Sequence, residues 1–108
     1  MALARGVQGA THTPQQITWV DIDGTPVDLT GATITGRIED YVTGTSRNIT
    51  GTLTITDADS GVFQWDYGDE DVEDYGPFRV QFIATYGGGE TDISVMADWA
   101  VERAIQVV

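Results

Sequence analysis

Hydrophobic and polar residues alternate with a period of two along several short stretches of this chain. In an extended strand this period places successive side chains on opposite faces of a sheet, so one face can be buried while the other meets solvent. The clearest case has Phe78, Val80 and Phe82 on one face and Arg79 and Gln81 on the other. Strands are expected from this pattern at residues 17–21, 32–39, 49–56, 62–67, 78–86 and 91–95.

Two features of the pattern leave alternatives open. Gly36 lies inside the strand expected at residues 32–39, where a glycine marks either a bulge or the close approach of an aromatic side chain from the facing layer. Residues 96–108 carry Trp99 and Val101 in alternation with small or polar neighbours, which favours a closing strand. Their alanine, glutamate and arginine content is also compatible with a helix.

About seven short strands with turn signals between them predict an all-β fold, an antiparallel β-sandwich. The length of 108 residues is enough for one domain with a two-layer core. We assign the sandwich to residues 17–108, with Trp65 or Trp19 as the central core aromatic. Residues 1–16 are small and polar with little to pack, so they are expected to form a flexible N-terminal arm.

The formal net charge is −12, and all five basic residues are arginines. A charge of this sign repels polyanions, so direct binding to nucleic acid or to an anionic membrane surface is not expected. No apolar run approaches the roughly 20 residues that a membrane-spanning helix needs. The acidic surplus fits either simple solubility or docking on a basic partner surface.

Catalytic chemistry finds little support in the sequence. The chain has no cysteine, and its one histidine, His12, lies in the expected arm, where nothing holds a base in register. Paired carboxylates are present, but a glycosidase-type pair needs a separation of about 5–10 Å within a cleft, which a sandwich of this size rarely forms. We therefore predict a protein that is not an enzyme.

The most charged stretch, residues 68–76, is too acidic for a strand and is expected to form one helical turn. Carboxylates packed this closely repel one another unless a cation or a basic partner neutralises them. Calcium, which takes roughly six to eight oxygen ligands, is one such cation, and its candidate ligands here are Asp69, Asp71 and Asp74. A structural role in a turn is the favoured interpretation of this segment. As a binding surface, its five carboxylates are predicted to face a basic patch of a partner protein: Asp69, Glu70, Asp71, Glu73 and Asp74.

Two further sets of residues have both a structural and a binding interpretation. Asp21 with Asp23 and Asp28, and Asp57 with Asp59, could supply calcium ligands, but aspartates also bond the backbone of turns, and the turn interpretation is favoured. Exposed aromatic residues could stack on a sugar, although such residues more often belong to the core. The members of that platform would be Trp19, Trp65, Trp99, Tyr75 and Tyr86.

Four segments occur in an order that carries a family resemblance. They are DGTPVDLTGA at residues 23–32, ITDADSGV at residues 55–62, YGPFRVQF at residues 75–82, and the hairpin at residues 86–90. Together they resemble the N-terminal domain of phage baseplate upper proteins, over about residues 17–101. The resemblance implies an Ig-like β-sandwich, anchored in a phage tail or baseplate, with neither catalysis nor a cofactor.

On this basis we expect a virion structural protein that is made in the host cytoplasm and assembled into the phage particle. Its partners would be other phage structural proteins in a symmetric assembly, where many weak contacts act together. The N-terminal arm is the second expected contact, through backbone bonds at a sheet edge, with Ala2, Leu3, Arg5 and Val7 as its partner-binding residues. A capsid decoration protein and an extracellular calcium- or carbohydrate-binding module are the alternatives.

Overall fold

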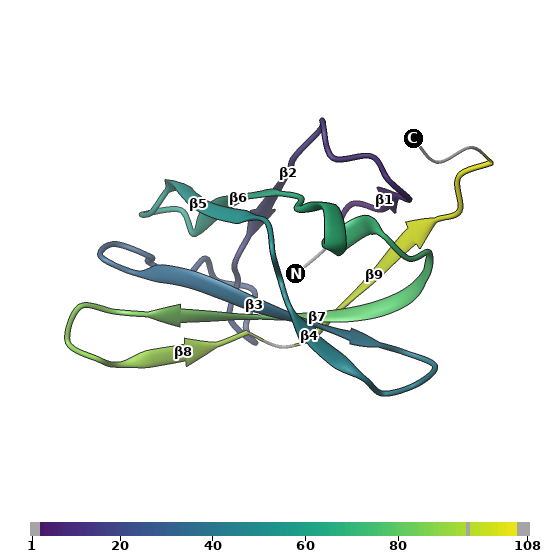
Figure 1. Cartoon of the computed structure of the whole chain (residues 1–108). Coiled ribbons are helices and arrows are strands. Elements are labelled where there is room, and N and C mark those ends of the chain that lie inside the picture. The colour runs from purple at the N-terminus through teal and green to yellow at the C-terminus, as the bar shows by residue number, and fades with distance from the viewer. Residues whose placement is uncertain (1–2, 95, 106–108) are drawn as a thin grey trace.

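Two β-sheets face each other in the computed structural model, which describes residues 3–94 and 96–105 (Figure 1). Sheet A has the strand order β1 (Gly6–Val7), β9 (Ala97–Glu102), β7 (Gly76–Thr85), β3 (Thr33–Asp40) and β4 (Ser46–Asn48), and β8 (Thr91–Ile93) also pairs with β7. Sheet B has the order β2 (Gln15–Thr18), β6 (Val62–Asp66) and β5 (Thr52–Asp57). A turn of 3-10 helix, η1 (Asp69–Val72), lies between β6 and β7.

The core lies between the two sheets and is built by the alternation that the sequence shows. Along β7, Phe78, Val80 and Phe82 are buried, while Arg79 and Gln81 between them are more exposed. Aromatic rings meet across the core: the ring centroids of Phe63 in β6 and Phe82 are 4.9 Å apart, and those of Trp65 in β6 and Trp99 in β9 are 4.7 Å apart. Each large apolar side chain contributes about 1.5–3 kcal/mol on burial, so this aromatic layer holds the two sheets together.

The all-β class is confirmed, and both candidate central aromatics, Trp19 and Trp65, are buried. The described residues form nine strands rather than about seven, because β1 and β4 are too short to show an alternating pattern. The strands pair antiparallel, except that β1 runs parallel to β9. The C-terminal segment forms strand β9, as favoured over a helix, although residues 106–108 lie outside the described residues.

Gly36 lies in β3, whose register with β7 is unbroken, so it does not mark a bulge. A Cβ at this position would come within 3.1 Å of Cδ1 of Phe82 and 2.5 Å of Cδ1 of Ile49. The glycine therefore admits the close approach of an aromatic ring. That ring comes from the neighbouring strand of the same sheet, which corrects the expectation of a ring from the facing layer.

The N-terminal segment is held against the sandwich over its described residues, which corrects the expectation of a flexible arm at residues 1–16. β1 pairs with β9, and β2 begins at Gln15, inside the expected arm. The Gln15 side chain accepts a hydrogen bond from the Ala4 N–H and donates one to the Ala4 carbonyl. The indole N–H of Trp99 donates to the same carbonyl.

The outward faces of the two sheets differ in composition. Sheet A presents arginines, carboxylates and exposed apolar side chains, among them Arg79, Asp98 and Tyr41. Among the residues that the structure describes, there is no helix with the length and apolar character to cross a membrane. The outward positions of sheet B are mostly uncharged and polar, and include Gln16, Thr18, Thr52, Thr54 and Thr56.

Candidate functional site

The acidic segment forms the expected helical turn, η1, but one of its carboxylates points into the protein. Asp71 is fully buried. Its Oδ1 accepts hydrogen bonds from the backbone N–H of Thr50 at 2.8 Å and from the hydroxyl of the same residue at 3.2 Å. Its Oδ2 accepts bonds from the backbone N–H groups of Gly51 and Gly68, both at 2.9 Å, and from the indole N–H of Trp65 at 3.2 Å.

This arrangement assigns Asp71 an internal role. Charge-assisted bonds from several donors are what a buried carboxylate requires, because it has lost its hydration. Asp71 anchors the turn to the loop before β5, and it is not on a surface that a partner can contact. This corrects its place among the predicted partner-binding residues.

The anchored turn lies very close to residues 50–51. A Cβ at Gly51 would lie 2.6 Å from the backbone nitrogen of Gly68 and 2.8 Å from Oδ2 of Asp71, separations that real Cβ atoms do not reach, so the loop needs glycine there. Val72, which is also buried, connects the turn to the N-terminal segment, because the Gly9 N–H donates to its carbonyl. The turn is thus fixed from two sides.

The other four carboxylates of the predicted set are exposed. They present negative charge at one end of the sandwich, as docking on a basic surface requires. Within residues 3–94 and 96–105, no three histidine or acidic side chains gather as a metal site would need. The exposed members are Asp69, Glu70, Glu73 and Asp74.

Two of the remaining aspartates bond their own turns. Oδ1 of Asp21 accepts hydrogen bonds from the backbone N–H groups of Asp23 at 2.8 Å and Thr25 at 3.0 Å. Oδ1 of Asp28 accepts bonds from both the N–H and the hydroxyl of Thr30, and these bonds lower the pKa of Asp28 below its ordinary value. The turn interpretation is confirmed for these two residues.

The aromatic residues do not form a platform for stacking on a sugar. The side chains of Trp19, Trp65 and Trp99 are all buried in the core. Tyr75 is exposed, but its ring lies 5.7 Å from the guanidinium carbon of Arg103. Stacking on a sugar needs exposed ring faces that lie together, whereas the three tryptophan rings lie inside the core and Tyr75 lies at the surface.

The N-terminal segment presents its odd-numbered side chains on the outward side of sheet A. Gly6 is buried beside Val101 of β9, so alternation turns its two neighbours outward. Arg5 forms an ion pair with Glu102 at the end of β9. Of the contact residues predicted for this segment, Leu3, Arg5 and Val7 lie on this side, and Ala2 lies outside the described residues.

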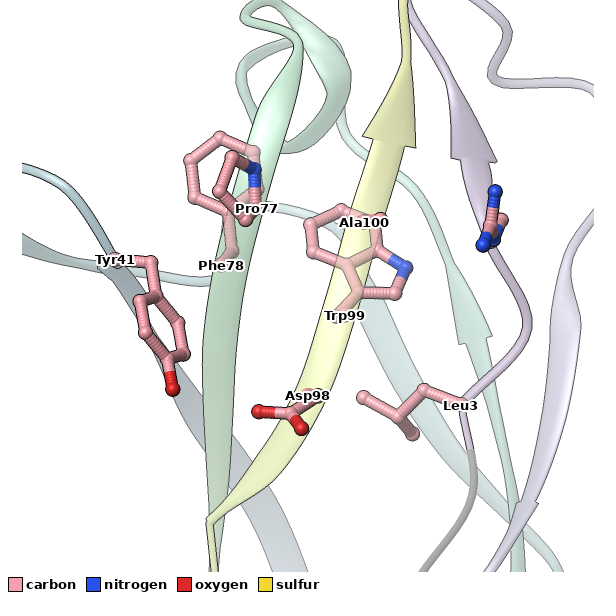
Figure 2. Close-up of a pocket in the computed structure, with 8 residues that line it drawn as sticks. Leu3, Tyr41, Pro77, Phe78, Asp98, Trp99 and Ala100 are labelled. Atoms are coloured by element: carbon pink, nitrogen blue, oxygen red, sulfur yellow. The ribbon is translucent and has the colours of Figure 1, made fainter.

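A groove of about 540 Å³ lies on this outward side (Figure 2). Figure 2 shows Leu3 beside β9 and Tyr41 beside β7, on opposite sides of the two strands. Between them Pro77 and Ala100 form a cross-strand pair, and the small side chain of Ala100 leaves the groove open. The volume is in the range of roughly 300–1,000 Å³ that binding pockets occupy.

Charged side chains cross the same face in a row. The register pairs Glu39 of β3 with Arg79 of β7, and Arg79 with Asp98 of β9. Arg79 donates a hydrogen bond to Glu39, and its guanidinium carbon lies 4.5 Å from the centroid of the Tyr41 ring. These residues could not be recognised as a surface cluster from the sequence pattern. The sequence feature that could have indicated an exposed contact surface is the apolar pair Tyr41–Val42 at the start of an otherwise polar loop.

The chain matches no protein-family model and no curated protein. The phage-protein resemblance therefore depends on the four sequence segments alone.

Proposed function

We propose that this chain is a non-enzymatic structural protein of a phage particle, in the tail or baseplate, that acts by docking onto other virion proteins. The observation that carries the proposal is the groove on sheet A, which is bordered by two residues that the sequence had assigned to a partner contact, Leu3 and Arg5. The groove is open, partly apolar and formed mainly by strands of the sandwich, as a docking site requires.

The strand order supports the Ig-like part of the proposal. In a variable-type immunoglobulin sandwich, strands C, F and G form one sheet with C′ beside C, and strands B, E and D belong to the other sheet. Here β9, β7, β3 and β4 correspond to G, F, C and C′, and β2, β6 and β5 correspond to B, E and D. β1 lies beside the G-like strand, where it closes that edge.

The acidic turn supplies a second surface of different character. Asp69 and Glu70 lie on η1, which the buried Asp71 and Val72 fix in place, and Glu73 and Asp74 follow it directly. A rigid, charged surface steers the approach of a basic partner and sets its orientation. In a symmetric particle, repetition of such a contact compensates for weak affinity at each site.

The test of location is peptide mass spectrometry on density-purified phage particles from the source, with heads and tails separated. Peptides of this chain in the tail fraction are expected. Peptides in the head fraction would instead support a capsid decoration protein. If neither fraction contains the chain, the virion proposal is wrong, and a binding module outside the particle takes its place.

The test of mechanism is incorporation of a tagged copy that is supplied during infection. Replacement of Asp69, Glu70 and Asp74 by their amides is expected to reduce incorporation, because it removes three exposed charges without touching the buried anchor. A matched control replaces Asp23, Asp57 and Asp59 by asparagine, which removes the same charge from exposed positions elsewhere. Equal incorporation of both variants would contradict docking through the acidic turn. A thermal shift with millimolar calcium that the first variant loses would point to the calcium alternative.

A further inference from the structure

The outward face of sheet A differs in charge from the rest of the molecule. It holds three of the five arginines and only three of the seventeen acidic residues, so the face is neutral while the remainder carries the whole net charge of −12. The charged residues of the face are Arg5, Arg37, Arg79, Glu39, Asp98 and Glu102.

Apolar side chains are also exposed on this face. Tyr41 is 52% exposed and Met96 is 56% exposed, and Met96 lies over β3 and β7, where it borders a small hollow beside Arg79. Ile93 is 58% exposed and pairs across the strands with Ile83. Exposed apolar groups gathered on a neutral face are typical of a protein–protein contact.

The register of the strands arranges this face in two rows. Pro77 pairs with Ala100, and Arg79 pairs with Asp98, so each row runs across β3, β7 and β9 to the segment before β1. We call one of them the upper row, and it consists of Tyr41, Pro77, Ala100 and Arg5. The other, the lower row, consists of Glu39, Arg79, Asp98 and Leu3.

We propose that this face pairs with the same face of a second copy, about a two-fold axis along the seam between β7 and β9. Such an axis places β7 of one copy over β9 of the other. Because the axis runs along the strands, each row of one copy faces the same row of the other copy. Arg79 of each copy then meets the second copy's Asp98, which forms two symmetric ion pairs. In the upper row, Tyr41 meets the second copy's Arg5, a cation–π pair, over the groove that Ala100 leaves open.

Charge favours a second copy over a basic partner at this face. A neutral face offers no net attraction to a basic surface, whereas its mixed charges complement their own rotated image. Two copies that each carry −12 repel through the rest of their surfaces, so added salt should strengthen this dimer by screening the repulsion. Docking through the acidic turn has the opposite salt dependence. The proposal goes beyond the proposed function, because it concerns the free chain in solution. In such a dimer the second copy covers the groove, so docking of another virion protein there requires the dimer to dissociate.

The experiment is sedimentation velocity of the full chain at protein concentrations up to about 1 mM. We expect a dimer whose dissociation constant falls when NaCl is raised from about 20 to about 300 mM. Asp98→Arg should raise the dissociation constant more than about tenfold, because two arginines then oppose each other across the axis. This variant is also less negative, which by itself favours association, so a loss of dimer is specific to the pair.

Two further variants make the result decisive. Asp23→Arg makes the same change of charge in an exposed turn away from the face and should leave the dimer intact. The double variant Arg79→Asp with Asp98→Arg restores opposite charges across the axis and should restore the dimer. A wild-type chain that stays monomeric at about 1 mM and about 300 mM NaCl overturns the proposal. The proposal is also wrong if Asp98→Arg leaves the dissociation constant of the dimer unchanged. It is equally wrong if Asp98→Arg and Asp23→Arg raise that constant by the same factor.

Discussion

At the scale of single residues, the stability of the acidic turn depends on Asp71. Asp71→Ala would leave several buried N–H donors without an acceptor, and each such donor costs about 1–3 kcal/mol. We expect the free energy of unfolding in urea to fall by at least about 3 kcal/mol. The exposed neighbour supplies the control, since Asp69→Asn should change stability by no more than about 0.5 kcal/mol. Equal effects of the two substitutions would show that Asp71 does not anchor the turn.

A second residue-scale prediction concerns Tyr67, whose hydroxyl accepts a hydrogen bond from the Gln15 side chain at 2.7 Å. Burial raises the pKa of Tyr67 above its ordinary value, and the negative charge of Asp71 raises it further. Because the folded pKa lies above the unfolded one, the stabilisation is complete below the unfolded value of 10.0 and is lost as the pH rises through the folded value.

Near-ultraviolet absorbance, which reports phenolate, tests this directly. Tyr67→Phe should remove a component that ionises above the ordinary tyrosine range, and it should weaken the loss of stability at alkaline pH. Tyr86 also has a raised pKa, chiefly because of burial, so a late component from that residue should remain. Substitution of the exposed Tyr75 is the control. Identical late ionisation in the wild type and Tyr67→Phe would contradict the prediction.

At the scale of elements, the first segment depends on how closely β1 approaches β9. A Cβ at Gly6 would lie 3.1 Å from Cζ2 of Trp99 and 3.3 Å from Cγ1 of Val72. Gly6→Val should therefore push β1 away from β9 and cost about 1–3 kcal/mol of stability. Hydrogen exchange of the Gln8 and Gly9 amides, which donate to Glu102 and Val72, should become faster.

The matched control for this element is Val7→Thr, which keeps a β-branched side chain at an exposed position of the same strand. It should leave the exchange of both amides unchanged. If Gly6→Val also leaves both amides protected, the segment is held by something other than its contact with β9.

The elements also show how far sequence can predict this fold. Strands β3, β6 and β7 could be located because an alternating pattern is a local property that burial on one face imposes. The attachment of the N-terminal segment could not, because it depends on the side chain of Gln15 and on the distant Trp99. Polar residues that bond across the fold carry no periodic signal.

The same contrast holds within the candidate site. Exposure of the acidic turn followed from its composition, and four of its five carboxylates are indeed exposed. The burial of Asp71 did not follow, because its donors at residues 50–51 are remote in sequence and are mostly backbone groups. The groove could not be foreseen either, since Tyr41, Pro77 and Ala100 become neighbours only through the register of β3, β7 and β9.

At the scale of the whole molecule, the uneven distribution of charge sets the response to salt. Repulsion among the carboxylates outside the face of sheet A opposes the compact state, and added salt screens it. The opposing contribution is small, because the ion pairs Arg5–Glu102 and Arg79–Glu39 are exposed or half-exposed and such pairs contribute about 0–1 kcal/mol each. Net repulsion should therefore dominate.

We expect the free energy of unfolding to rise by about 1 kcal/mol between about 20 and about 300 mM NaCl. Urea unfolding at about micromolar protein measures this without a contribution from self-association. A variant with Glu70→Gln and Glu73→Gln should show a smaller rise, because it removes two charges from the most crowded part of the surface. A stability that falls with salt would mean that the two ion pairs outweigh the repulsion, and the neutral face of sheet A would then be a stabilising feature of the monomer.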